Sequence, residues 1–151
     1  RFRETTTRVV RSRPSGGRIA RDRNRHGSCS GQGMAITSYR DPDVWQVSMD
    51  LVDHIIADSN AMPRVEFDLK RQIRRAAISI PSNIAEGWRR KGRRQAYQNH
   101  VSIAMGSHGE LETQLEVCFR NGFLQRKESV RALELMRRVG PMLDRLYQSL
   151  D

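Results

Sequence analysis

Residues 79–87 read Ser-Ile-Pro-Ser-Asn-Ile-Ala-Glu-Gly, and this stretch decides the fold of the chain. It continues a helical apolar pattern, but Pro81 removes one backbone donor and predicts a kink in that helix. Asn83 and Glu86 have the spacing of a capping box and can restart the helix beyond the kink. Neighbouring hydroxyl and amide side chains can bond the backbone groups that the proline frees. We therefore assign a structural role to the residues around the bend: Pro81, Ser82, Asn83, Glu86 and Gly87.

Apolar residues recur every three or four positions in four segments, which predicts four amphipathic helices. These segments span about 43–59, 66–87, 93–120 and 126–150. Asp41 is expected to cap the first helix, with Pro42 in its first turn. Because the connections are short, consecutive helices are expected to run antiparallel. The sequence therefore predicts an all-α protein, an up-down-up-down four-helix bundle with a kinked second helix.

Glycine and proline residues mark special positions in the last two segments. Gly106 and Gly109 fall in the middle of the third helix, where each glycine costs roughly 1 kcal/mol relative to alanine. We expect close backbone approach to a neighbouring helix to offset that cost. Asn121-Gly122 is a stop signal for the third helix, and Pro141 predicts a kink in the fourth.

The first 33 residues differ in composition from the rest of the chain. They hold nine Arg against Glu4 and Asp22, with few large apolar side chains. Such a segment cannot bury enough apolar surface to offset the entropy of ordering. We expect a basic, disordered N-terminal extension over residues 1–38 and the bundle over residues 39–151. Two interpretations of the extension stay open: sequence upstream of a natural start at Met34, or a basic arm that binds nucleic acid.

The net charge of +10 is distributed unevenly along the chain. Residues 34–63 hold Arg40 against five Asp, a net −4, whereas residues 64–94 hold ten Lys and Arg against three acidic residues, a net +7. Residues 95–151 carry seven charges of each sign. Asymmetry of this kind is typical of chains that bind an anionic partner.

The basic residues of segment 64–94 form two groups, one early in the second helix and one after it. Arg71 and Arg89 are separated by about five helical turns, so both groups can share one face. Trp88 can stack on a base, and arginines bind phosphates. The candidate nucleic-acid-binding residues are Lys70, Arg71, Arg74, Arg75, Trp88, Arg89, Arg90, Lys91, Arg93 and Arg94. The alternative is a solvated basic face with Trp88 packed over the helix end.

No pattern in the chain points to catalysis or to a metal. The glycines at Gly87 and Gly92 have the spacing of a phosphate-binding loop, but the Lys and Ser/Thr of that loop are missing and no strand precedes it. The stretch Gly106-Ser107-His108-Gly109 lacks one glycine that a nucleophile elbow needs, because Met105 occupies that position. The histidines show no i, i+4 pairing. We predict a protein that is not an enzyme, with no catalytic residues, metal ligands or cofactor.

The cysteines and the hydropathy bear on the cellular setting. Cys29 and Cys118 have no partner at metal or redox spacing. No stretch reaches the roughly 18 apolar residues that a membrane span needs, and the Arg-rich start lacks the apolar block of a secretory signal. We therefore predict a reduced, cytoplasmic setting and no membrane partner.

Four motifs resemble those of the four-helix-bundle proteins encoded within 23S rRNA intervening sequences. They are Val44-Trp45-Gln46, Gln72-Ile73-Arg74-Arg75-Ala76, residues 79–87 as quoted above, and Glu110-Leu111-Glu112-Thr113-Gln114-Leu115. The similarity spans roughly Tyr39 to Leu150, which is nearly all of the patterned region. The order of residues in the third motif is specific to this family.

The resemblance implies function as well as fold. It implies a bundle that assembles into a ring-shaped homo-oligomer, usually a pentamer, and a relation to the accessory proteins of diversity-generating retroelements. Those proteins bind nucleic acid and a reverse transcriptase through basic surfaces. Family members have no established catalytic activity, and many are of unknown function. Arg74, Arg75, Arg90 and Lys91 match basic positions of the family, whereas His108 stands where a bulkier side chain is expected.

Two functions remain in competition. The first is a non-enzymatic homo-oligomer that binds RNA or DNA through its basic surface. The second is a structural or protein-interaction oligomer, such as a reverse-transcriptase scaffold, whose arginines pair with acidic residues of neighbouring subunits. Nucleic-acid binding that weakens steeply with salt favours the first, and assembly that collapses in high salt without nucleic acid favours the second.

Overall fold

The computed structural model describes residues 38–40 and 42–151, so residues 1–37 of the expected extension lie outside the described part. A short 3-10 helix, η1 (Arg64–Glu66), lies between the first two α-helices. The four α-helices are α1 (Asp43–Asn60), α2 (Phe67–Arg89), α3 (Arg94–Arg120) and α4 (Val130–Gln148). Because the described residues contain no strand, the prediction of an all-α protein with four helices is confirmed.

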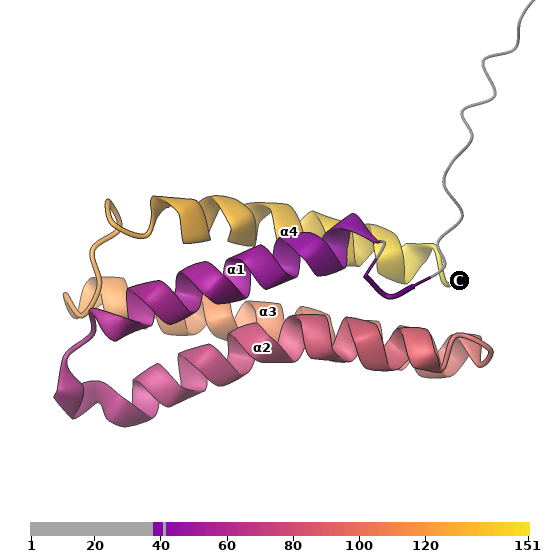
Figure 1. The fold of residues 1–151 in the computed structure, drawn as a ribbon, viewed down its shortest axis with the longest axis horizontal. Coiled ribbons are helices and arrows are strands. Elements are labelled where there is room, and N and C mark those ends of the chain that lie inside the picture. Colours follow the sequence, from indigo (N-terminus) through magenta and orange to yellow (C-terminus); the bar gives the residue numbers. More distant parts are fainter. Residues whose placement is uncertain (1–37, 41) are drawn as a thin grey trace, which may run out of the picture. The chain divides into compact units, whose positions relative to one another are not determined.

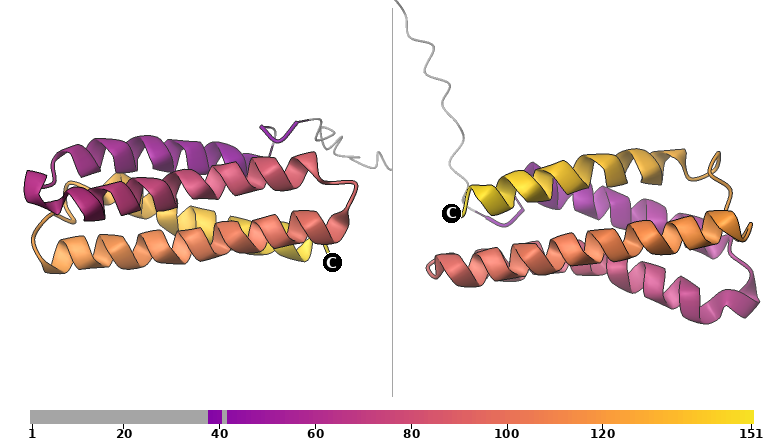
Figure 2. Two further views of the ribbon diagram at one scale, coloured as in Figure 1. Left: turned by 90° about the horizontal axis from the view of Figure 1, so that it is seen from below. Right: turned by 180° about the vertical axis from the view of Figure 1, so that it is seen from behind.

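The four helices lie lengthwise beside one another (Figures 1 and 2). α2 packs against α1 and α3, and α4 also packs against α1 and α3, so every helix contacts two others. The α1–α2 and α3–α4 connections lie at one end, and the α2–α3 connection lies at the other (Figure 1). The segment between Arg89 and Arg94 therefore forms an end of the helical region.

One apolar core runs between the helices, and it is built from the 3.6-residue apolar stripes of the sequence. Burying a large aliphatic side chain contributes roughly 1.5–3 kcal/mol, so these stripes determine which side of each helix faces inward. The core includes the fully buried side chains of Leu51, Ile55, Ile73, Ile80, Ile84, Leu111, Leu135 and Leu143.

Cys118 belongs to this core, and burial raises the pKa of its thiol to about 11. Since the thiolate is the reactive species, we expect a thiol reagent to label Cys118 at neutral pH only as fast as the core opens. Labelling should become rapid once guanidinium unfolds the chain. Mass spectrometry of the Cys118 peptide over time, with and without denaturant, checks this expectation. Rapid labelling of the native protein would contradict the buried position.

The helix ends follow local sequence signals with small displacements. α1 begins at Asp43, and Pro42 occupies the N-cap position instead of the predicted first turn; Asp41 lies outside the described residues. α3 ends at the predicted stop signal, where Gly122 has a positive φ of 71°. A residue with a Cβ is strained in that conformation, which explains the glycine.

The two interior prolines do not interrupt their helices. α2 runs past Pro81 and α4 runs past Pro141 as single helices. The predicted restart of the helix at Asn83 is therefore wrong, because the Asn83 side chain instead donates to the Ser79 carbonyl at 2.9 Å within a continuous helix. A bend at Pro81 stays a prediction.

The expected role of the two α3 glycines is also wrong. Gly106 and Gly109 are exposed, and a Cβ built at either would meet nothing within 4 Å, so neither permits close approach of another helix of the same chain. The close approach occurs at Gly87 of α2. A Cβ there would lie 2.3 Å from Cδ2 of Tyr97 on α3.

Candidate nucleic-acid interface

Five cationic side chains gather where α2 ends and α3 begins. They are called here the turn cluster: Arg89, Arg90, Lys91, Arg93 and Arg94. All five are exposed, and none forms an ion pair within residues 38–40 and 42–151. Backbone bonds fold the segment tightly, with the Arg93 N–H donating to the Arg90 carbonyl at 2.7 Å. Because like charges held close together repel, the turn cluster favours an anionic partner.

The start of α3 adds to this positive potential. Its first turn holds no acidic residue, and no side chain caps it at Arg93. Unsatisfied N–H groups give the N-terminus of a helix a partial positive charge. The N–H groups at this helix end can therefore bond an anion that the turn cluster attracts, although the adjoining C-terminus of α2 carries the opposite partial charge.

Trp88 packs at the base of the turn cluster. Its half-buried ring meets Tyr97 edge to face, with ring centroids 6.5 Å apart. The Lys91 ammonium lies 4.0 Å from the centroid of the indole. Burial raises the pKa of Tyr97, whose hydroxyl therefore stays neutral at pH 7. This geometry agrees with the alternative of packing over the helix end, and base stacking by Trp88 stays a prediction.

The second group of candidate residues lies in the first half of α2. The Lys70 ammonium donates to the Met62 carbonyl at 3.3 Å, next to the start of η1. The exposed Arg71 pairs with Asp68 at 3.3 Å. Eighteen residues separate Arg71 from Arg89, which corresponds to about 27 Å along the helix. The ten predicted residues therefore form two separate groups.

A groove lies beside this second group, between α2 and α3. Its volume is about 650 Å³, and its lining includes Arg71, Arg75 and Ser79 of α2 with Glu110 of α3. Glu110 accepts a hydrogen bond from the Gln114 amide at 2.8 Å. The groove thus combines two exposed guanidinium groups with one carboxylate.

Arg74 differs from its neighbours because it holds the end of α1. Its Nε donates to Ser59 Oγ at 2.7 Å, and its Nη2 donates to Asn60 Oδ1 at 2.7 Å. Ser59 is fully buried. This guanidinium joins α1 to α2, so Nε and one N–H of Nη2 are already engaged within the chain.

We expect Arg74→Ala to lower the free energy of unfolding by roughly 1.5–3 kcal/mol, because the hydrogen bonds it loses come from a charged group. Arg75→Ala, one residue further on and exposed, should change it by about 0.5 kcal/mol at most. Urea unfolding of both variants at one subunit concentration, followed by circular dichroism, makes the comparison. Equal effects would contradict the structural role of Arg74.

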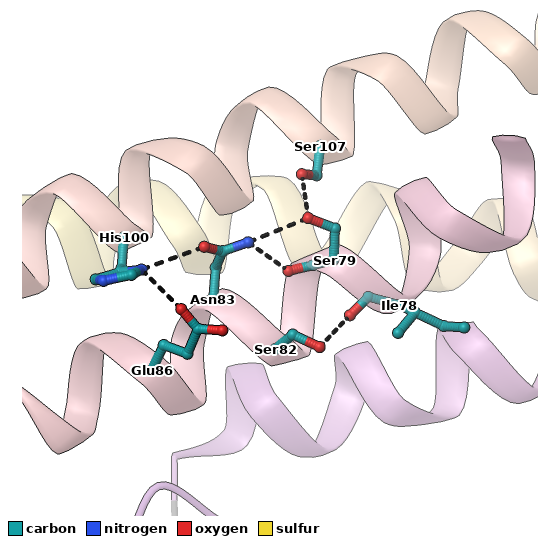
Figure 3. A network of polar contacts seen from close by, with 7 residues as sticks. All are labelled: Ile78, Ser79, Ser82, Asn83, Glu86, His100 and Ser107. Carbon is teal, nitrogen blue, oxygen red and sulfur yellow. Dashed lines mark hydrogen bonds and ion pairs between the residues drawn. The ribbon is translucent and has the colours of Figure 1, made fainter.

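A chain of polar contacts joins α2 to α3 along the predicted structural motif (Figure 3). Asn83 lies at its centre: the amide nitrogen donates to Ser79 Oγ at 3.1 Å, and the amide oxygen lies 3.3 Å from His100 Nδ1. Ser79 Oγ also bonds Ser107 Oγ at 2.8 Å. Glu86 Oε2 lies 3.6 Å from the same His100 nitrogen. These contacts connect two helices that also share the apolar core.

Two members of this network lie outside the motif of residues 79–87. His100 and Ser107 lie on α3, and the register of α3 against α2 decides that they face Asn83 and Ser79. A single sequence carries no signal for that register. The predicted Ser82 lies on the exposed side of α2, where its hydroxyl donates to the Ile78 carbonyl at 2.8 Å.

A second groove, between α3 and α4, accommodates the side chain of His108. The groove measures about 660 Å³, and apolar residues such as Leu115 and Met136 share its lining with charged residues such as Glu112. His108 borders it, with Nε2 2.9 Å from the Met136 carbonyl. A Cβ at Gly140 would lie 3.2 Å from the His108 ring, so the glycine opposite leaves room for the imidazole.

Within the described residues, no group of three or more His, Cys, Asp or Glu side chains is placed to hold a metal ion. None of the described helices has the length and apolar character that a membrane crossing requires.

In the part of the chain that the structure describes, the fold is all-helical and the turn cluster forms no ion pair. The sequence model of the 23S rRNA-intervening sequence proteins matches residues 40–145, well over half of the chain. The chain therefore belongs to the 23S rRNA-intervening sequence protein family, as the four motifs predicted. A search of the curated proteins found no match.

Proposed function

We propose that this protein is a non-enzymatic, cytoplasmic nucleic-acid-binding protein that contacts RNA through the turn cluster. One observation carries the proposal: five exposed cations lie together without an acidic partner in the described part of the chain. Phosphates supply the missing charge, and release of their counterions drives binding. Contacts of this kind position a backbone and do not read bases, so the protein binds many sequences, DNA included.

The proposal includes a homo-oligomer. Connections that alternate between the two ends support an up-down-up-down bundle. Family membership supports a ring-shaped assembly, with a pentamer as the favoured form. A ring presents several turn clusters at once, and several linked contacts raise the affinity for a long polyanion without any new kind of contact.

The second candidate function is a protein scaffold without direct nucleic-acid binding, for example one that supports a reverse transcriptase. The acidic outer side of α1 favours it. Asp43, Asp50 and Asp53 are exposed there, and none is neutralised among the described residues. A basic partner, including a second copy of this chain, complements such a face.

Fluorescence anisotropy with a short labelled RNA distinguishes the two functions. The protein is treated with nuclease first, and the wild type is compared with a triple variant of the turn cluster, Arg89→Gln with Arg90→Gln and Arg93→Gln. A matched control removes three exposed arginines of α4, by Arg137→Gln, Arg138→Gln and Arg145→Gln.

We expect the turn-cluster variant to lose most of its RNA binding at low salt and the α4 control to retain it. If the wild type binds no RNA, the scaffold becomes the better function. If both variants bind as tightly as the wild type, RNA contacts a different surface.

A further inference from the structure

The outer side of α1 combines carboxylates with accessible aliphatic groups. Asp43, Asp50 and Asp53 are spaced by seven and three residues, so they follow one side of the helix. None forms an ion pair in the part of the chain that the structure describes. Met49 and Ile56 lie beside them, each 36% exposed. This set of five residues is called here the acidic face.

The outer side of α2 has the opposite charge and the same mixture. Arg71 and Arg75 are one turn apart and exposed, and Arg71 meets only the neighbouring Asp68, at 3.3 Å. Ile78, on the next turn, is 47% exposed. Arg71, Arg75 and Ile78 are called here the basic face.

We propose that these two faces bind each other between copies of the chain, the acidic face of one copy against the basic face of the next. The inference rests on the proposed homo-oligomer and identifies its contact surface. Charge complementarity carries it: within the described residues the acidic face forms no ion pair, and the basic face forms only the exposed Arg71–Asp68 pair, so each face can supply charge that the other lacks. Exposed ion pairs alone stabilise weakly, and the aliphatic side chains on both faces add apolar burial.

The placement of the faces determines the kind of assembly. They lie on different helices of one chain, so every copy offers one face of each sign, and the contact is heterologous. Heterologous contacts close into rings when the rotation between subunits permits. The turn cluster lies about 27 Å along α2 from Arg71 and stays free. The candidate residues thus divide by partner: Arg71 and Arg75 contact a second copy, and the turn cluster contacts phosphates.

Charge reversal and its rescue test the pairing. Asp50→Arg with Asp53→Arg makes the acidic face basic, and Arg71→Glu with Arg75→Glu makes the basic face acidic. Each pair of changes places like charges opposite each other, so the subunit dissociation constant should rise about tenfold or more. The variant with all four changes exchanges the two charges and should return to within about threefold of the wild type.

The measurement is sedimentation velocity of the full chain after nuclease treatment, over a range of concentrations. A matched control reverses two exposed acidic residues elsewhere, Glu128→Arg with Asp144→Arg, and should leave the dissociation constant unchanged. Far-UV circular dichroism verifies that every variant is folded. The variant with Arg71→Glu and Arg75→Glu should still bind RNA through its turn cluster.

The outcomes separate this interface from the assembly itself. If assembly survives both reversals, the interface is refuted while the homo-oligomer stands. If both reversals dissociate the protein and the fourfold variant shows no rescue, the two faces contact other surfaces, and the pairing is overturned. If the wild type is a monomer at every concentration, the homo-oligomer and the interface fall together.

Discussion

Replacing Gly87 with alanine should lower the free energy of unfolding by about 1–3 kcal/mol, the usual cost of overpacking a filled site. The added Cβ would lie 2.3 Å from Tyr97 Cδ2 and 3.1 Å from His100 Cβ. Tyr97 is buried and meets Trp88 on another side, so its ring has little room to move. Alanine is the better helix former by about 1 kcal/mol, and the clash must exceed that gain.

Gly106→Ala provides the matched control. It makes the same chemical change in the middle of α3, where a Cβ meets nothing within 4 Å. Only the higher helix propensity of alanine then changes the stability, and the free energy of unfolding should rise by about 0.5–1 kcal/mol. Chemical denaturation of Gly87→Ala and Gly106→Ala at equal subunit concentration makes the comparison. Stabilisation by both changes would show that α2 and α3 are not in close contact at Gly87.

RNA affinity should depend steeply on salt, and the turn cluster should account for most of that dependence. Each phosphate contact to a single strand contributes about −0.7 to the slope of log affinity against log salt. Five contacts give a slope of about −3.5, so raising salt from about 50 to 200 mM should weaken binding roughly 100-fold. Anisotropy titrations at several salt concentrations measure this slope.

Converting all five residues of the turn cluster to glutamine should remove most of the slope. The affinities of this variant and the wild type should then converge at high salt, where the electrostatic contribution is small. The triple α4 variant, Arg137→Gln, Arg138→Gln and Arg145→Gln, tests whether general loss of charge has the same effect. If the five-glutamine variant has the same salt slope as the wild type, this cluster is not the RNA contact.

The periodic apolar stripes predicted the helices because burial of those stripes drives the packing. Where no stripe acts, the prediction was less accurate. α4 begins at Val130 instead of Arg126, since the residues before it form turns in which the Ser129 N–H donates to the Gln125 carbonyl at 3.2 Å. The glycines of α3 were misassigned because a single sequence does not distinguish a tight contact from an exposed position.

For the candidate site too, the sequence predicted some features and missed others. Charge density alone predicted the turn cluster, because a short connection between helices leaves little room for burial. Charge density did not separate Arg74, which bonds Ser59 and Asn60, from the exposed Arg75 one position further on. That difference depends on where the end of α1 lies against α2, a tertiary relation that no local pattern encodes.

The turn cluster includes Arg89, the last residue of α2, and Arg94, the first residue of α3. Under the proposed function, an oligonucleotide that bridges them would hold the two helix ends together, since the ends could not separate without releasing it. A ligand that binds only the folded chain stabilises it by about 2.7 kcal/mol at a hundred times its Kd. A rise in melting temperature should therefore report that an oligonucleotide has bound the turn cluster. The size of that rise can rank unlabelled oligonucleotides by their affinity for the turn cluster.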